Sequence, residues 1–153
     1  MFMRGKTSAS WGIPQRATRV KPCKYRCADS RRAEDRLFEL LLDELRKRPD
    51  NVHARSLLGQ RLLSRGERAA GIAQVEMCLR MAPDDNRVLY NGACTLADAG
   101  EHARAMELLR EAARRVPGYI RDWPRHDPDL ESLRHNPEFI DEFNAMFAER
   151  DPA

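Results

Sequence analysis

The middle of the chain contains two consecutive segments of equal length, DNVHARSLLGQRLLSRGERAAGIAQVEMCLRMAP (50–83) and DDNRVLYNGACTLADAGEHARAMELLREAARRVP (84–117). Both end in proline and a proline also precedes the first, so prolines recur every 34 residues. An Xaa-Gly-Glu triplet shows the same spacing, with Gly66 at its centre in the first segment and Gly100 in the second. Two independent markers with one period predict a structure built from repeated units.

Each segment is predicted to fold as two helices joined by a tight turn. Apolar and small residues recur at helical spacing on both sides of Gly66 and Gly100, and glycine adopts the positive φ that closes such a turn. The recurring prolines end the second helices, because proline cannot continue a helix. The expected first helices are 51–65 and 85–99, and the expected second helices are 67–81 and 101–115.

The residues at fixed positions in both segments resemble the tetratricopeptide repeat, whose pattern is W-x2-L-G-x2-Y, A-x3-F and P. These positions hold Leu58, Gly59, Leu62, Gly71, Val75 and Pro83 in the first copy, and Leu89, Gly92, Ala93, Leu96, Ala105, Leu109 and Pro117 in the second. Two departures are Arg55, where the pattern has an aromatic residue, and Gly92-Ala93 in place of Leu-Gly. The resemblance implies an all-α fold, an α-solenoid of helical hairpins with a concave face lined by the first helices.

Two hairpins bury little apolar surface alone, so we expect a folded domain at 33–148 in which flanking helices cap the repeats. Residues 33–48 have an apolar stripe that predicts a helix before the repeats. The segment 118–148 follows them and is expected to contain two short helices, begun by the capping pairs Asp127-Pro128 and Asn136-Pro137. The apolar face expected on the second of these helices, at 137–148, consists of Phe139, Ile140, Phe143, Met146 and Phe147.

The tail from Asp127 to Phe139 also looks like the ending of tetratricopeptide modules in proteobacterial regulatory proteins. In those relatives the module often follows a nucleotide cyclase, a kinase or a DNA-binding domain. The resemblance leaves open whether the present sequence is a stand-alone module or a truncated one.

Positive charge is concentrated in the first 32 residues, which contain nine basic side chains and one acidic one, a net charge of +8. The remaining residues have a net charge of −5. The arm at 1–32 contains Pro22 and shows no helical apolar period, so we expect it to be disordered. Such an arm can also bind nucleic acid through the phosphates. The candidate residues for that contact are Arg4, Lys6, Arg16, Arg19, Lys21, Lys24 and Arg26.

The sequence favours a cytoplasmic protein without membrane contact. No apolar run approaches the roughly 18 to 20 residues that a membrane span requires. The first thirty residues lack the apolar stretch of a secretory signal. A reducing compartment and free thiols are therefore expected.

No group of residues predicts catalysis, a cofactor or a metal site. Gly5-Lys6-Thr7 resembles the end of a phosphate-binding loop but lacks the upstream glycine and strand. Cys23-x3-Cys27 lacks a second pair of cysteines or histidines to complete a metal site. We therefore predict that the protein is not an enzyme.

The resemblance implies a scaffold or adaptor that binds a peptide or helix of a protein partner in the concave face. The candidate contact residues are His53, Ser56, Leu57, Gln60 and Ser64 in the first repeat, and Arg87, Tyr90, Asn91, Cys94 and Asp98 in the second. The alternative is a regulatory protein whose basic arm contacts nucleic acid while the repeats bind a protein. In addition, apolar residues surround more of the helix 33–48 than one hairpin can cover, which favours self-association through that helix.

Overall fold

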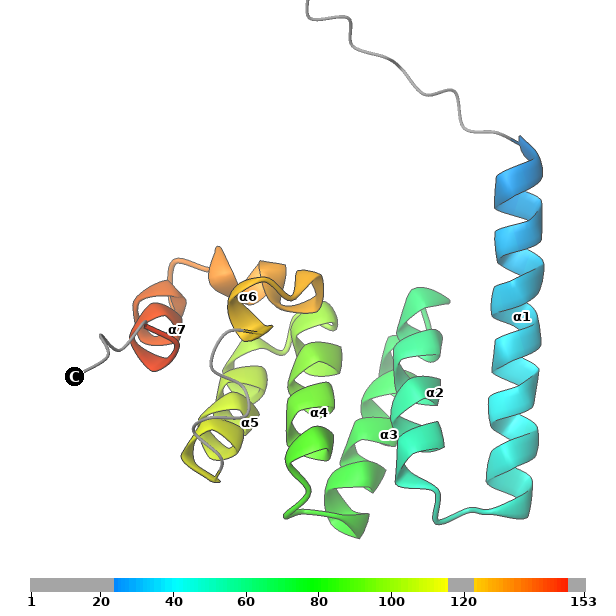
Figure 1. Cartoon of the computed structure of the whole chain (residues 1–153), viewed down its shortest axis with the longest axis horizontal. Coiled ribbons are helices and arrows are strands. Elements are labelled where there is room, and N and C mark those ends of the chain that lie inside the picture. The colour runs from blue at the N-terminus through cyan, green and yellow to red at the C-terminus, as the bar shows by residue number, and fades with distance from the viewer. Residues whose placement is uncertain (1–23, 116–122, 149–153) are drawn as a thin grey trace, which may run out of the picture.

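The computed structural model describes residues 24–115 and 123–148, and every regular element within them is helical. This confirms the predicted all-α class, with no strand in the described ranges (Figure 1). In chain order the elements are α1 (Lys24–Lys47), α2 (Val52–Ser64), α3 (Arg68–Met81), α4 (Asn86–Asp98), α5 (His102–Arg115), the 3-10 turns η1 (Trp123–Arg125) and η2 (Pro128–Leu130), α6 (Glu131–Arg134) and α7 (Ile140–Met146).

The four helices predicted in the two 34-residue segments are confirmed as α2 to α5. The turns between α2 and α3 and between α4 and α5 have the same backbone geometry, with φ of 81° at Gly66 and 79° at Gly100. In both turns the N–H of the next residue donates to a carbonyl five residues back, Glu67 to Leu62 at 2.9 Å and Glu101 to Leu96 at 2.8 Å. Glycine is required there because a side chain disfavours positive φ.

The starts of the first helices are fixed by side-chain caps. The Asn51 carboxamide oxygen accepts from the Ala54 N–H at 3.0 Å, and the Asp85 carboxylate accepts from the Arg87 N–H at 2.8 Å. Each cap satisfies a backbone donor that has no partner within its helix. The prolines Pro49 and Pro83 lie in the turns just before these caps.

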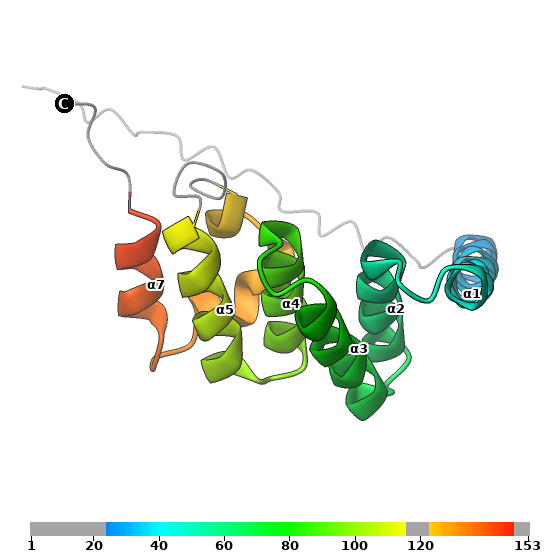
Figure 2. The same ribbon diagram turned by 90° about the horizontal axis from the view of Figure 1, so that it is seen from below.

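The helices lie side by side in chain order from α1 to α5 (Figure 2). Helix α2 packs mainly on α3 and α4 mainly on α5, while α3 and α2 both contact α4. Close approach of α2 and α3 depends on two glycines, because a Cβ on Gly71 would lie 2.9 Å from the Gly59 carbonyl oxygen. The small and apolar positions of the 34-residue pattern are all buried: Leu58, Gly59, Leu62, Gly71, Val75, Leu89, Gly92, Ala93, Leu96, Ala105 and Leu109.

Helix α1 begins at Lys24, nine residues before the predicted start, and corrects the boundary placed at 33. The region between Pro22 and Pro49 contains neither proline nor glycine, so nothing interrupts the helical backbone there. The N-terminal half of α1 extends beyond the other helices (Figure 1). Its C-terminal half packs on α2 through buried Leu41 and half-buried Phe38, and the Arg65 guanidinium lies 4.5 Å from the centre of the Phe38 ring.

The C-terminal segment packs on α4 and α5 through η2, α6 and α7. The Asp127 cap is confirmed, since its carboxylate accepts from the Asp129 N–H at 3.0 Å. Helix α7 begins at Ile140 and not at 137, because residues 137–139 form a turn in which the Phe139 N–H donates to the Asn136 carbonyl. Leu130, Leu133 and Phe143 are almost completely buried in the main core with α4 and α5.

Of the helices in the described part of the chain, none is long and apolar enough to cross a membrane.

Candidate peptide-binding groove

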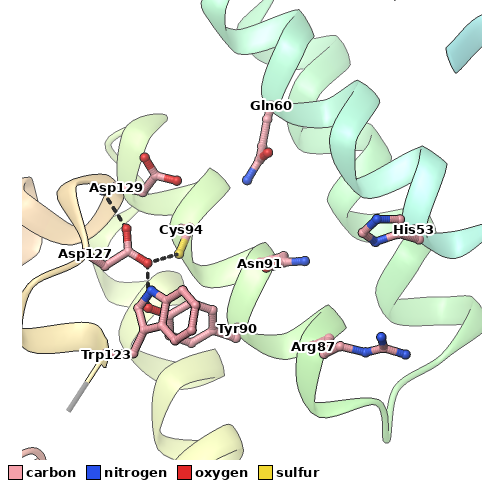
Figure 3. A pocket seen from close by; sticks show the side chains of 9 residues that line it. All are labelled: His53, Gln60, Arg87, Tyr90, Asn91, Cys94, Trp123, Asp127 and Asp129. Carbon is pink, nitrogen blue, oxygen red and sulfur yellow. Dashed lines mark hydrogen bonds between the residues drawn. The ribbon is translucent and has the colours of Figure 1, made fainter. Parts of the chain in front are cut away.

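Six of the predicted contact residues line one pocket of about 320 Å³ (Figure 3). Because α2 and α4 run in the same direction, residues at matching positions of the two helices come together on one side. The pocket is completed by the C-terminal segment, which supplies Trp123, Asp127 and Asp129. The predicted residues in its wall are His53 and Gln60 from α2, and Arg87, Tyr90, Asn91 and Cys94 from α4.

The other predicted residues lie outside this pocket. Ser56 is 8% exposed, so its side chain has little surface to offer a ligand. Leu57 packs against the cluster between α1 and α2. Ser64 and Asp98 line a separate hollow at the C-terminal ends of α2 and α4. The helical period placed these residues on the first helices correctly. Ser56 and Leu57 are directed elsewhere by their rotation about the axis of α2, whereas Ser64 and Asp98 lie one turn beyond the pocket residues Gln60 and Cys94.

A hydrogen-bond network joins α4 to the C-terminal segment at the pocket wall. The Tyr90 hydroxyl donates to Asp127 Oδ2 at 2.6 Å, and the Cys94 thiol lies 4.0 Å from the same oxygen (Figure 3). On the other side, Arg134 Nη1 donates to the carbonyl oxygens of Asp127 at 2.5 Å and of Pro124 at 3.0 Å. The position of Asp127 is therefore fixed by its side chain and by its backbone.

The surroundings of Tyr90 and Cys94 favour the neutral forms of both side chains. Burial, followed by the neighbouring carboxylates, raises the pKa of the Cys94 thiol well above its ordinary range. Burial and the hydrogen bond to Asp127 raise the pKa of Tyr90 in the same direction. Since a thiolate is the reactive form of cysteine, Cys94 is a neutral side chain at neutral pH and not a nucleophile.

Negative charge gathers at one end of the pocket. Asp127 and Asp129 line this end, and burial, followed by repulsion from Asp127, raises the pKa of Asp129. Among the residues that the structure describes, no ion pair joins Asp129 to a cation. The opposite end contains Arg87 and His53, from the first turns of α4 and α2 (Figure 3). The pocket is therefore acidic at one end and basic at the other.

Sequence reasoning did not assign Trp123, Asp127 or Asp129 to the groove. The sequence identified Asp127 as a helix cap, and it is a cap, but its second carboxylate oxygen also faces the pocket. Trp123 is 72% exposed although it is large and apolar. Neither its spacing nor its neighbours connected it with α4, since contact between the two segments is a property of the tertiary fold.

The described residues include one group of side chains whose sulfur and oxygen atoms could act as ligands of a cation. The Cys94 sulfur and one carboxylate oxygen each of Asp127 and Asp129 lie within 4.8 Å of one another. Burial and the neighbouring carboxylates raise the pKa of the Cys94 thiol, so a cation bound through this sulfur would have to displace its proton. The prediction that no metal binds is not tested by these distances.

The residues considered for nucleic-acid contact fall in two regions. Lys24 and Arg26 belong to the first turn of α1, so they are part of a helix and not of the expected disordered arm. The other candidates, Arg4, Lys6, Arg16, Arg19 and Lys21, lie outside the described residues.

Comparisons of the chain with protein-family models, with curated proteins and with solved structures each find no match.

Proposed function

We propose that the chain is a tetratricopeptide-like interaction module that binds an extended peptide of a protein partner in the groove between α2 and α4. The main observation is that six side chains chosen from the repeat pattern line one pocket with the C-terminal segment. Its volume, about 320 Å³, suits one or two peptide side chains. The pocket wall combines aromatic rings with a few polar groups, as binding pockets commonly do.

The repeated geometry of the two hairpins supports the tetratricopeptide-like part of the proposal. Both turns have a glycine at positive φ and the same hydrogen bond from the following glutamate. The buried small residues also occupy matching positions in both hairpins, since Ala105 of α5 lies 34 positions after Gly71 of α3. A module of this type places its ligand against the first helices, which here are α2 and α4.

A selection from a random peptide library, with the full chain as bait, tests the proposal. The enriched peptides are then measured against a triple variant, His53→Ala, Gln60→Ala and Asn91→Ala, whose side chains are exposed or half-buried. We expect binding to weaken by about tenfold or more, because truncating a few contact residues costs more than about 1.4 kcal/mol. Glu107→Ala, at an exposed position of α5, is the control and should bind as the wild type does.

Two results would refute the groove as the binding site. One is a selection that enriches no peptide, and the other is a set of peptides that bind the triple variant as tightly as the wild type. Circular dichroism of the triple variant shows whether its helices remain.

A second candidate is nucleic-acid binding through the basic arm, favoured by the net charge of +8 at residues 1–32. Deletion of residues 1–23, combined with glutamine at Lys24, Arg26, Arg31 and Arg32, removes all nine basic residues of the arm without shortening α1, which begins at Lys24. If the arm binds duplex DNA, affinity should fall by about 0.9 log unit per log unit of salt for each phosphate contacted. Equal binding by the deleted and full chains, or no binding even at low salt, would refute this candidate.

A further inference from the structure

Asp127 and Asp129, at the acidic end of the groove, differ in the hydrogen bonds that their carboxylates accept from the described residues. Both oxygens of Asp127 already accept hydrogen bonds, from the Tyr90 hydroxyl at 2.6 Å and the Asp129 N–H at 3.0 Å. The Asp129 side chain has no such bond among the described residues, so its oxygens are open to a donor in the pocket. Two carboxylates thus lie together, and among the described residues only Asp127 receives a hydrogen bond at both of its oxygens.

The described residues pair no cation with Asp129. Among them, Arg61 is the cation whose attraction lowers the pKa of Asp129, and it forms no ion pair with that carboxylate. Burial, followed by repulsion from Asp127, raises the pKa of Asp129, so the ionised form of this carboxylate costs free energy at its half-buried position. A bound cation would remove that cost, and its own charge would be stabilised in return.

Trp123 adds an independent feature that fits a cation. It lines the same pocket, is 72% exposed, and comes from η1, next in the chain to the segment that contains Asp127. Figure 3 shows its indole on the same side of the pocket as Tyr90 and Asp127. The face of an indole attracts guanidinium and ammonium groups, and an exposed indole on a pocket wall is available for that contact.

We infer that the acidic end of the groove is a pocket for a basic side chain of the partner peptide, with arginine preferred over lysine. This inference rests on the proposed function and specifies its ligand. A guanidinium presents a planar fork of donors that pairs with a carboxylate and at the same time stacks on an aromatic ring. An ammonium is a compact charge without the stacking face, so lysine should bind more weakly. Arg87 and His53 at the other end disfavour a second cation there.

The experiment is a titration of the isotope-labelled full chain with N-acetyl-arginine methylamide, followed by amide and indole NMR shifts. The citrulline analogue is the matched control, since it has the same shape as arginine without the charge. Shifts at Trp123, Asn91 and Asp129 should saturate with the arginine compound, and the citrulline compound should bind about tenfold more weakly or worse. The Trp123 indole signal is distinguished from that of Trp11 by a Trp123→Phe variant.

Asp129→Asn provides the second arm of the test, with Glu107→Gln as a control at an exposed position of α5. Arginine binding should weaken about tenfold in Asp129→Asn and remain unchanged in Glu107→Gln. Equal affinity for arginine and citrulline, or for wild type and Asp129→Asn, would overturn the inference. Saturable shifts with zinc chloride at the same residues, without a response to arginine, would overturn it in favour of a metal site.

The outcomes separate this inference from the proposed function. If the selected peptides require the groove but show no preference for basic residues and arginine causes no shift, the inference fails and the proposed function remains. If arginine binds in the pocket but no peptide is enriched, peptide binding by the groove fails and the cation pocket remains.

Discussion

The hydroxyl of Tyr90 in α4 donates a 2.6 Å hydrogen bond to the carboxylate of Asp127, which lies 37 residues further along the chain. This bond connects the second repeat to the C-terminal segment and fixes one wall of the groove. The donor is half-buried, and its acceptor is charged, so the bond is of the stronger kind. The shape of the candidate site therefore depends on a contact between two segments that are distant in sequence.

Tyr90→Phe should lower the free energy of unfolding by about 1–2 kcal/mol, because the Asp127 carboxylate loses a donor at a half-buried position. Urea unfolding followed by circular dichroism measures the change. A double-mutant cycle with Asp127→Ala isolates the pair, because alanine has no atom that can bond to the Tyr90 hydroxyl. If the effects of the two substitutions simply add, the bond does not stabilise the fold.

Gly59→Leu and Ala93→Leu should each cost roughly 1–3 kcal/mol through overpacking. A Cβ on Gly59 would already lie 3.2 Å from the Gly71 carbonyl oxygen, and Ala93 has no exposed surface. Ala73→Leu on the exposed side of α3 is the matched control and should change stability by less than about 0.5 kcal/mol. Unchanged urea midpoints for the two buried positions would contradict the helix crossings described above.

Asp129→Asn should stabilise the fold at pH 7 by less than about 1 kcal/mol, the size of a charge effect at a partly exposed site. The pKa of Asp129 in the folded protein is raised above 3.8, chiefly by burial, so folding favours its protonated form. Stability from this group is present at low pH and decreases as pH rises from about 3.8 through the raised pKa. The gain in Asp129→Asn should therefore vanish below about pH 3.8.

Thermal or urea unfolding of wild type and variant across pH 3 to 7 measures this difference. Asp43→Asn is the control. A hydrogen bond from Lys47 lowers the pKa of Asp43, so removal of this carboxylate should not stabilise the fold at pH 7. A variant Asp129→Asn that is less stable than the wild type at pH 7 would show that the carboxylate is already compensated.

Leu40→Glu should reduce self-association of the full chain, which we propose occurs through α1. Leu37 and Leu40 are 38% and 50% exposed, on a helix whose apolar residues Phe38, Leu41, Leu42 and Leu45 pack on α2. Sedimentation velocity over a range of concentrations measures the effect, with Arg46→Gln as a control that makes the same change in net charge elsewhere on α1. A wild-type chain that stays monomeric at high concentration would refute association through this surface.

The sequence alone determined the elements whose geometry is local. The 34-residue period, the recurring prolines and the glycines at Gly66 and Gly100 placed four helices and their turns, because helix and turn hydrogen bonds join residues at most five positions apart. The same period placed six groove residues on one side of two parallel helices. It failed at the start of α1, where an unbroken helix continues without an apolar face to reveal it.

The tertiary structure alone decided what closes the groove and which of its ends is acidic. Trp123, Asp127 and Asp129 reach α4 from a segment more than thirty positions away, and no spacing in the sequence encodes that approach. The approach is set by burial of Leu130, Leu133 and Phe143 in the core with α4 and α5, which is a non-local contact. Nonpolar packing of this segment therefore brings its carboxylates to the pocket, and the charge of the site follows from the burial of apolar side chains distant in sequence from α4.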